Sequence, residues 1–144
     1  MLQQTLQRLY RQLRLTSYRQ IFGAIRERSG SLSATEAFSA DVIQLLGAPT
    51  LSQFAQYLGI SQPNATYKIN NLVAKGYVEK VRGEEDGRIV YVSLTRQGRR
   101  IDSAHRYFHE SMVRSIIRDM TESEMQALYK GVMKLDAFLK EQLK

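Results

Sequence analysis

Amide, hydroxyl and cationic side chains gather between Ile60 and Gly76, where the apolar residues recur at helical spacing. If Ala65, Ile69 and Leu72 face a core, the polar residues face outward or flank that face. Asn and Gln amides can donate to and accept from adenine, Lys can reach guanine or phosphate, and a helix N-terminus can hold a phosphate. The residues that would read DNA in this way are Ser61, Gln62, Asn64, Thr66, Tyr67, Lys68 and Asn71. An ordinary polar helix face is the alternative.

A hairpin is predicted directly after this helix. Tyr77–Val81 alternates like a strand, residues 83–87 read Gly-Glu-Glu-Asp-Gly, and Ile89–Leu94 is an alternating, β-branched return strand. A polar helix followed by a hairpin with a charged tip is typical of a recognition helix with a β-wing.

Charged residues surround the tip of this hairpin. Arg88 is suited to a narrow minor groove, whose negative potential attracts a guanidinium group, and Asp86 could orient Arg88 through a bidentate pair. Arg82 lies at the other side of the turn. Glu84 and Glu85 complicate this interpretation, because at least one of them must point away from DNA phosphate. A solvated turn of mixed charge is the alternative.

The elements before the hairpin have helix-turn-helix spacing. Thr50 can cap a short helix, Gly59 permits a tight turn, and Ser61 can cap the next helix with Pro63 in its first turn. Such a turn locks two helices at a steep angle, so that the second can enter a major groove. The expected inner residues are Leu51, Phe54, Ala55 and Leu58 in the first helix and Ala65, Ile69, Leu72 and Val73 in the second.

An earlier helix is predicted to begin after Ser33. Ser33–Glu36 matches the S/T-x-x-E capping box, and Gly47 and Pro49 close the helix. Its expected buried face consists of Phe38, Val42, Leu45 and Leu46.

Long amphipathic helices are predicted at both ends of the chain. The first is interrupted at Ser29–Ser31, Thr95 can cap a helix that runs to about Met120, and Thr121–Glu124 is another capping box. These helices carry more apolar surface than a small centre covers, which predicts a two-fold homodimer. The apolar stripes are Leu2, Leu6, Leu9, Leu13, Ile21, Phe22 and Ile25 in the first helix and Met125, Leu128, Val132, Leu135, Leu139 and Leu143 in the last.

The expected fold is therefore mainly α with a small β-wing. We expect one domain over residues 1–144, with a winged helix-turn-helix DNA-binding core at 33–98 between dimerisation helices at 1–32 and 99–144.

Composition narrows the classes of partner. Lys and Arg number 21 against 14 Asp and Glu, a net charge of +7, which favours nucleic acid first and acidic proteins or anionic lipid second. Together with the predicted recognition helix and wing, this makes double-stranded DNA the expected partner. There is no cysteine, so disulfides, thiolate metal sites and cysteine nucleophiles are excluded. No apolar run approaches the length of a membrane span, and the N-terminus lacks the features of a signal peptide. We expect a cytoplasmic protein without a membrane partner.

The chain resembles winged helix-turn-helix regulators of the MarR family. The residues that carry the resemblance are Leu58-Gly59-Ile60-Ser61, Leu72-x3-Gly76-Tyr77-Val78, Asp86-x-Arg88 and Leu94-Thr95-x2-Gly98. The resemblance implies a homodimer on a pseudo-palindromic operator, with Arg88 in the minor groove and a small-molecule pocket between the dimerisation helices and the DNA-binding core. The chain departs from the family at Tyr67, where many members carry arginine, which implies a stacking contact or a hydroxyl bond to phosphate there.

The C-terminal half also resembles the branch of the family that represses fatty-acid synthesis genes in Gram-positive bacteria. The matching segments are His105-x2-Phe108-His109-x2-Met112-Val113, Ile116-Ile117-x2-Met120-Thr121 and Lys130-Gly131. The resemblance implies long-chain acyl-acyl carrier protein as corepressor. The expected pocket residues are Leu13, Phe22, Phe38, Val42, His105, Phe108, His109 and Met112. Core packing is the alternative for each of them.

A different effector also fits the residues. A phenolic or aromatic carboxylate that releases DNA is the alternative, and Arg11, Arg14 and Tyr18 could receive its anionic group. These three side chains could equally be solvated.

Other classes of function find less support. His105 and His109 have a spacing that can chelate a metal, and Glu110 adjoins them, but two histidines are not a site, so we expect no metal and no cofactor. No nucleophile motif, glycine-rich phosphate loop or convergent carboxylate pair is present, so we expect no enzyme and no catalytic residue. A winged-helix protein-interaction module would need an apolar recognition face, which Gln62, Asn64 and Lys68 contradict.

Overall fold

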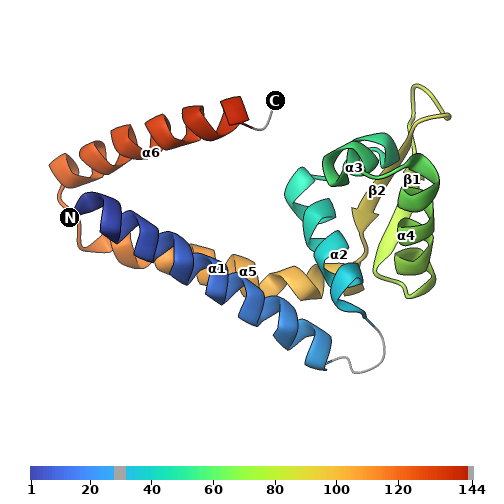
Figure 1. The fold of residues 1–144 in the computed structure, drawn as a ribbon, viewed down its shortest axis with the longest axis horizontal. Coiled ribbons are helices and arrows are strands. Elements are labelled where there is room, and N and C mark those ends of the chain that lie inside the picture. Colours follow the sequence, from blue (N-terminus) through green and yellow to red (C-terminus); the bar gives the residue numbers. More distant parts are fainter. Residues whose placement is uncertain (28–31, 143–144) are drawn as a thin grey trace. The chain divides into compact units, whose positions relative to one another are not determined.

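The computed structural model describes residues 1–27 and 32–142, and at 24, 26, 27 and 101–108 it describes the backbone alone. The elements are α1 (Leu2–Glu27), α2 (Ala34–Leu46), α3 (Leu51–Leu58), α4 (Gln62–Ala74), β1 (Val78–Arg82), β2 (Val90–Leu94), α5 (Arg96–Arg118) and α6 (Glu122–Gln142). They form two compact units, Met1–His105 and Arg106–Lys144 (Figure 1). This mostly helical architecture with one small hairpin confirms the predicted fold class. The predicted interruption at Ser29–Ser31 lies outside the described residues.

Local hydrogen bonds fix where the helices of the first unit begin. The Ser33 backbone N–H donates to Glu36 Oε2 at 2.8 Å and the Glu36 N–H donates to Ser33 Oγ at 3.2 Å, which is the predicted capping box. Thr50 and Gln53 form a second box before α3. Each box satisfies two backbone groups that the first helical turn leaves unpaired, so these starts are encoded locally.

The wing is a two-stranded antiparallel sheet. Val78 pairs with Leu94 at its base and Arg82 pairs with Val90 near its tip. The Val92 N–H donates to the Pro49 carbonyl at 2.9 Å, so the residues that precede α3 lie along the free edge of β2. This contact ties the wing to the helix-turn-helix.

The core of the first unit lies between α2, α3, α4 and the base of the hairpin. Ala65, Ile69 and Leu72 are fully buried, as predicted for the inner face of α4. Val73 is exposed, so its predicted inward position is wrong. The buried cluster consists of Leu32, Ala40, Ile43, Phe54, Ala55, Ala65, Ile69, Leu72, Tyr77, Val78, Val92 and Leu94, with Val42, Leu51, Leu58 and Ile60 packed against it.

Helix α2 buries a different face from the predicted one. Phe38, Leu45 and Leu46 are exposed, whereas the buried residues are Ala37, Ser39, Ala40 and Ile43. Ile43 is fully buried together with the small residues Ala37 and Ala40, and of the predicted residues only Val42 packs against the core. Hydrophobic size alone therefore pointed to the wrong stripe.

Gly98 lets α5 begin tightly against the start of β1. A Cβ atom at Gly98 would lie 2.1 Å from the Tyr77 carbonyl oxygen, far inside van der Waals contact. The Thr95 hydroxyl donates to the Gly76 carbonyl at 2.6 Å and accepts from the Gly98 N–H at 3.1 Å. Thr95 is thus the predicted start of the long helix, and it also joins that helix to the end of α4.

Helix α6 carries an apolar stripe that the second unit leaves exposed. Thr121 and Glu124 form the predicted capping box, but none of the described α6 residues is buried. The stripe residues Met125, Leu128, Val132, Leu135 and Leu139 are exposed in the single chain, so their burial against a second subunit stays a prediction, and Leu143 lies outside the described residues. In α1, Ile21 is buried while Leu2, Leu6, Leu9 and Phe22 are exposed. No described helix combines the length and apolarity needed to cross a membrane.

Candidate nucleic-acid interface

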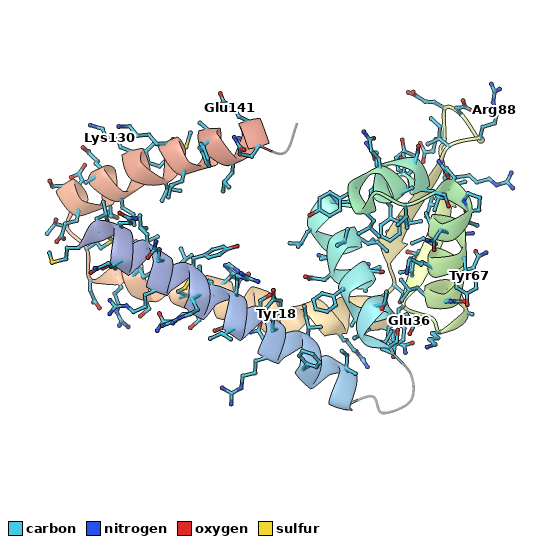
Figure 2. The ribbon with its side chains drawn as sticks, viewed as in Figure 1. Tyr18, Glu36, Tyr67, Arg88, Lys130 and Glu141 are labelled. Atoms are coloured by element: carbon cyan, nitrogen blue, oxygen red, sulfur yellow. The ribbon has the colours of Figure 1, made fainter. Side chains whose placement is uncertain are left out.

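Helix α4 presents a polar face on the side opposite the core. Ala65, Ile69 and Leu72 define its buried side, and Tyr67, two residues from both Ala65 and Ile69, points away from it. Figure 2 shows Tyr67 directed outward from the helix. Gln62 and Asn64 are also exposed, whereas Thr66, Lys68 and Asn71 are half-buried at the flanks.

Two of these side chains make hydrogen bonds within the helix end, of which the Ser61 cap was predicted and the Thr66 contact was not. The Thr66 hydroxyl donates to the Gln62 carbonyl at 2.9 Å, so its proton is used within the helix. Ser61 Oγ accepts from the Asn64 N–H at 3.3 Å, which leaves the Ser61 hydroxyl hydrogen available as a donor. Because Pro63 has no N–H, the Ser61 hydroxyl and the Gln62 N–H are the main donors for a phosphate at this helix end.

The wing tip holds Arg88 next to Asp86. Asp86 Oδ1 accepts the Arg88 backbone N–H at 2.9 Å and the Arg88 Nε at 3.3 Å. The predicted contact is present, but a single carboxylate oxygen makes it, so the pair is not bidentate. The Arg88 side chain is 94% exposed and projects from the tip (Figure 2). Its other guanidinium nitrogens thus remain available to a ligand. Arg82 is exposed at the end of β1.

The structure adds a polar link between the wing and α4 that the sequence analysis missed. Lys80 Nζ donates to Asn70 Oδ1 at 2.5 Å, which joins β1 to the exposed side of α4. Asn70 lies three residues after Tyr67, so helical spacing was a usable signal for it. Lys80 had no comparable signal, because its partner is ten residues away on another element.

An ion pair fixes the other end of α4 to α2. Lys75 Nζ lies 2.7 Å from Glu36 Oε2, the carboxylate that also caps α2. Partial burial raises the pKa of Glu36, but the hydrogen bonds from Lys75 and from the Ser33 backbone outweigh burial and leave that pKa below its ordinary value. The carboxylate is therefore charged at neutral pH and holds the C-terminal end of α4 in place.

The predicted pocket residues are divided between the two units, each of which is described by itself. Val42 packs against the core, Phe38 meets the Tyr18 ring edge-on at a centroid distance of 6.4 Å, and Leu13 is half-buried on α1. Phe22 lines an open hollow of roughly 440 Å³ with Arg19, Gly23 and Ile25. In the second unit His109 is exposed and Met112 half-buried, while the side chains of His105 and Phe108 lie outside the described residues.

Arg14 stands between two tyrosines on α1. Its Nη2 donates to the Tyr18 hydroxyl at 2.9 Å, and its guanidinium lies 5.6 Å from the ring centroids of both Tyr10 and Tyr18. The hydrogen bond that Arg14 donates to the Tyr18 hydroxyl raises the pKa of Arg14, so the cation is retained. Arg11 is exposed on the same helix. Across the described part of the chain, no three His, Asp or Glu side chains converge as a metal site would require.

A helix-turn-helix whose second helix is followed by a basic-tipped hairpin defines the winged-helix class of DNA-binding proteins. The sequence model of the MarR family matches residues 41–89. Streptococcus pneumoniae FabT, solved in complex with DNA, is 33% identical, and the match covers 95% of this chain and 99% of that chain with a TM-score of 0.58. The chain therefore belongs to the MarR family and is a DNA-binding transcriptional regulator.

Two further relatives extend the comparison. YcgE, an HTH-type transcriptional regulator of Bacillus subtilis strain 168, is 27% identical over 143 residues, which is 99% of this chain and 91% of YcgE. A MarR mutant from E. coli, solved with operator DNA, is 21% identical with a TM-score of 0.52 over 90% of this chain and 92% of that one, and shows the shared fold. Family and fold are those of transcriptional regulators rather than of enzymes.

Proposed function

We propose that the protein is a repressor that binds a pseudo-palindromic operator as a homodimer, with α4 in the major groove and the wing at the adjacent minor groove. The observation that carries this proposal is the polar outward face of α4, whose exposed amides and phenol stand opposite a fully buried apolar face. Amide side chains on such a helix recognise base edges, and cations at its flanks contact phosphate. The predicted DNA-contacting residues that remain on this surface are Ser61, Gln62, Asn64, Thr66, Tyr67, Lys68 and Asn71.

The wing supports a second contact through Arg88. An exposed guanidinium at the end of a narrow hairpin fits a minor groove, where the negative potential is strongest in narrow stretches. Asp86 limits the directions that Arg88 samples, because the two residues share hydrogen bonds at 2.9 and 3.3 Å. Arg82, at the other side of the turn, is positioned to contact phosphate.

Dimerisation through α6 and the start of α1 explains their exposed apolar stripes. Leu128, Val132, Leu135 and Leu139 follow one another at helical spacing and are all exposed in the single chain. A stripe of this length on one helix is normally buried against a second subunit. Two copies related by two-fold symmetry would then present two recognition helices to successive half-sites.

For the effector, we propose long-chain acyl-acyl carrier protein as corepressor in control of fatty-acid synthesis genes. Its support is the C-terminal motif from His105 to Gly131 and the 33% identity to FabT over nearly the whole chain. The acyl chain would lie among the apolar residues of the predicted pocket. Phe22, one of these residues, lines an open hollow on α1.

One observation favours a second effector class, a phenolic or aromatic carboxylate. Arg14, held between the rings of Tyr10 and Tyr18, combines a cation with aromatic surfaces, which suits an aromatic anion. In this case the ligand would release DNA. Substitution of Arg14 by Gln removes the charge and separates the two effector proposals, because acyl-chain binding needs no cation there.

The test begins with selection of duplexes from a random DNA pool by the purified full chain. We expect an enriched inverted repeat with half-sites about one helical turn apart. Binding of that repeat is then measured with long-chain acyl-acyl carrier protein, with unacylated carrier protein as control, and with 2-hydroxybenzoate. Tighter binding with the acylated form alone supports the corepressor proposal, and release by 2-hydroxybenzoate that the Arg14→Gln variant loses supports the alternative. Failure to enrich any repeat, both alone and with acylated carrier protein, contradicts operator binding.

A further inference from the structure

The Tyr67 side chain points away from the core that α4 covers. The helix turns about 100° per residue, so a residue placed two positions from both Ala65 and Ile69 lies opposite the side that they bury. Tyr67 is accordingly 67% exposed, and Figure 2 shows it directed outward. A helix that enters the major groove with its buried side toward its own core therefore carries Tyr67 toward the floor of the groove.

This position favours the base edges over the phosphates as the partner of Tyr67. The major groove is about 12 Å wide and about 8.5 Å deep, so flanking residues meet the phosphate walls and the outermost residue meets the base pairs. Lys68 and Asn71, half-buried at the flanks, are better placed for the walls. The Tyr67 side chain makes no hydrogen bond to any described residue, so its ring is not held against the protein.

The chemistry of an aromatic ring selects among base edges. Pressed against the N7, O6 or N4 atoms of purines and cytosine, a ring covers polar groups without satisfying them. The 5-methyl group of thymine is the one apolar feature in the groove, and apolar side chains contact it favourably. Thr66, whose hydroxyl proton is used by the Gln62 carbonyl, adds no donor that would compete for a polar edge beside it.

We propose that Tyr67 is a specificity-determining residue whose ring contacts the 5-methyl group of a thymine in each operator half-site. This inference rests on the proposed operator binding and adds the identity of one base pair to it. Substitution of thymine by deoxyuridine removes only the methyl group, and 5-methylcytosine adds a methyl group to a G·C pair at the same place.

The experiment measures the affinity of the full chain for its selected operator in which each thymine in turn is replaced by deoxyuridine. At one symmetric position the replacement should weaken binding roughly fourfold, the fold-change expected for one buried methyl-sized group. In Tyr67→Ala that sensitivity should disappear. Tyr67→Phe, which keeps the ring, should retain it. Cytosine at this position should bind more tightly once it carries a 5-methyl group.

Lys68→Ala is the matched control, since it removes a neighbouring contact without touching the ring. It should weaken binding to the thymine and deoxyuridine duplexes by the same factor. Thermal unfolding of each variant checks that it is folded. Because the Tyr67 side chain is exposed, its substitution is not expected to change the unfolding temperature. The inference is overturned if Tyr67→Ala still distinguishes thymine from deoxyuridine, or if Tyr67→Phe loses as much as Tyr67→Ala. If the wild-type chain selects no operator, the result contradicts both the proposed function and this inference. If it selects an operator but its affinity does not depend on a thymine methyl group, the result contradicts this inference alone.

Discussion

Asp86 and Arg88 are joined at the wing tip by two hydrogen bonds to one oxygen: Asp86 Oδ1 accepts the Arg88 backbone N–H at 2.9 Å and its Nε at 3.3 Å. The first bond shapes the turn and the second directs the side chain. An acidic residue beside DNA would ordinarily repel phosphate. The effect of Asp86 on DNA affinity therefore depends on the arginine that it orients. The pair is exposed, and its contribution to stability is small.

Replacement of Arg88 by Ala should lower operator affinity by roughly tenfold, because a guanidinium contact in the groove is lost. Asp86→Ala should also weaken binding in the wild-type background, because the Arg88 side chain loses the hydrogen bond that orients it. In the Arg88→Ala background the same change should leave affinity equal or higher, since only the repulsion remains. Titration of labelled operator at fixed salt measures all four proteins. Equal effects of Asp86→Ala in both backgrounds would show that Asp86 does not act through Arg88.

Replacement of Glu36 by Gln should lower the free energy of unfolding by about 1 kcal/mol at neutral pH, because it weakens both the α2 cap and the contact with Lys75. The pKa of Glu36 is lower in the folded chain than its ordinary value of 4.5. Its stabilisation is therefore complete above that ordinary value and is lost as pH falls through the lower, folded value. Urea unfolding of both proteins from neutral to acid pH should show the difference closing.

Glu85→Gln is the control for this pH series, since Glu85 is exposed in the turn and makes no hydrogen bond to a described residue. It should leave the free energy of unfolding unchanged at each pH. A difference between wild type and Glu36→Gln that stays constant down to the most acid pH would contradict a role for the charged carboxylate.

Replacement of Gly98 by Ala should destabilise the first unit by about 3 kcal/mol, because the new methyl group would overlap the Tyr77 carbonyl oxygen 2.1 Å away. Urea unfolding measures the loss. Gly23→Ala on α1 is the matched control: nothing lies within 4 Å of the added atom, so the change should stabilise the helix by up to about 1 kcal/mol. A Gly98→Ala protein as stable as wild type would mean that α5 begins elsewhere.

Replacement of Leu135 by Glu should convert the proposed dimer to monomer at micromolar concentration, since a charge would enter the apolar stripe of α6. Sedimentation equilibrium measures the change, and operator affinity should fall because one half-site contact is lost. Lys134→Glu introduces the same side chain at the neighbouring position off the stripe and should remain dimeric. If Leu135→Glu is still a dimer, the chains associate through another surface.

Much of the fold follows from short-range patterns. The helix starts after Ser33, Thr50, Ser61, Thr95 and Thr121 were predictable, since each depends on hydrogen bonds within one turn. The hairpin was also predictable from the sequence, because strand alternation and a glycine-bearing charged turn are local signals. The inner face of α4 followed from helical spacing, with Val73 the exception at its edge.

The tertiary structure decided which of two possible stripes α2 buries. The large residues Phe38, Leu45 and Leu46 are exposed, whereas Ile43 and the small residues Ala37 and Ala40 are buried against the neighbouring elements. The contacts that orient α4 were also hidden, because Glu36 is 39 positions from Lys75 and Asn70 lies on a different element from Lys80. Such pairs depend on the angle at which elements pack, which residue spacing along one helix does not specify. The sequence by itself determined where the elements begin and what chemistry they carry, and the packing determined which side chains face outward together.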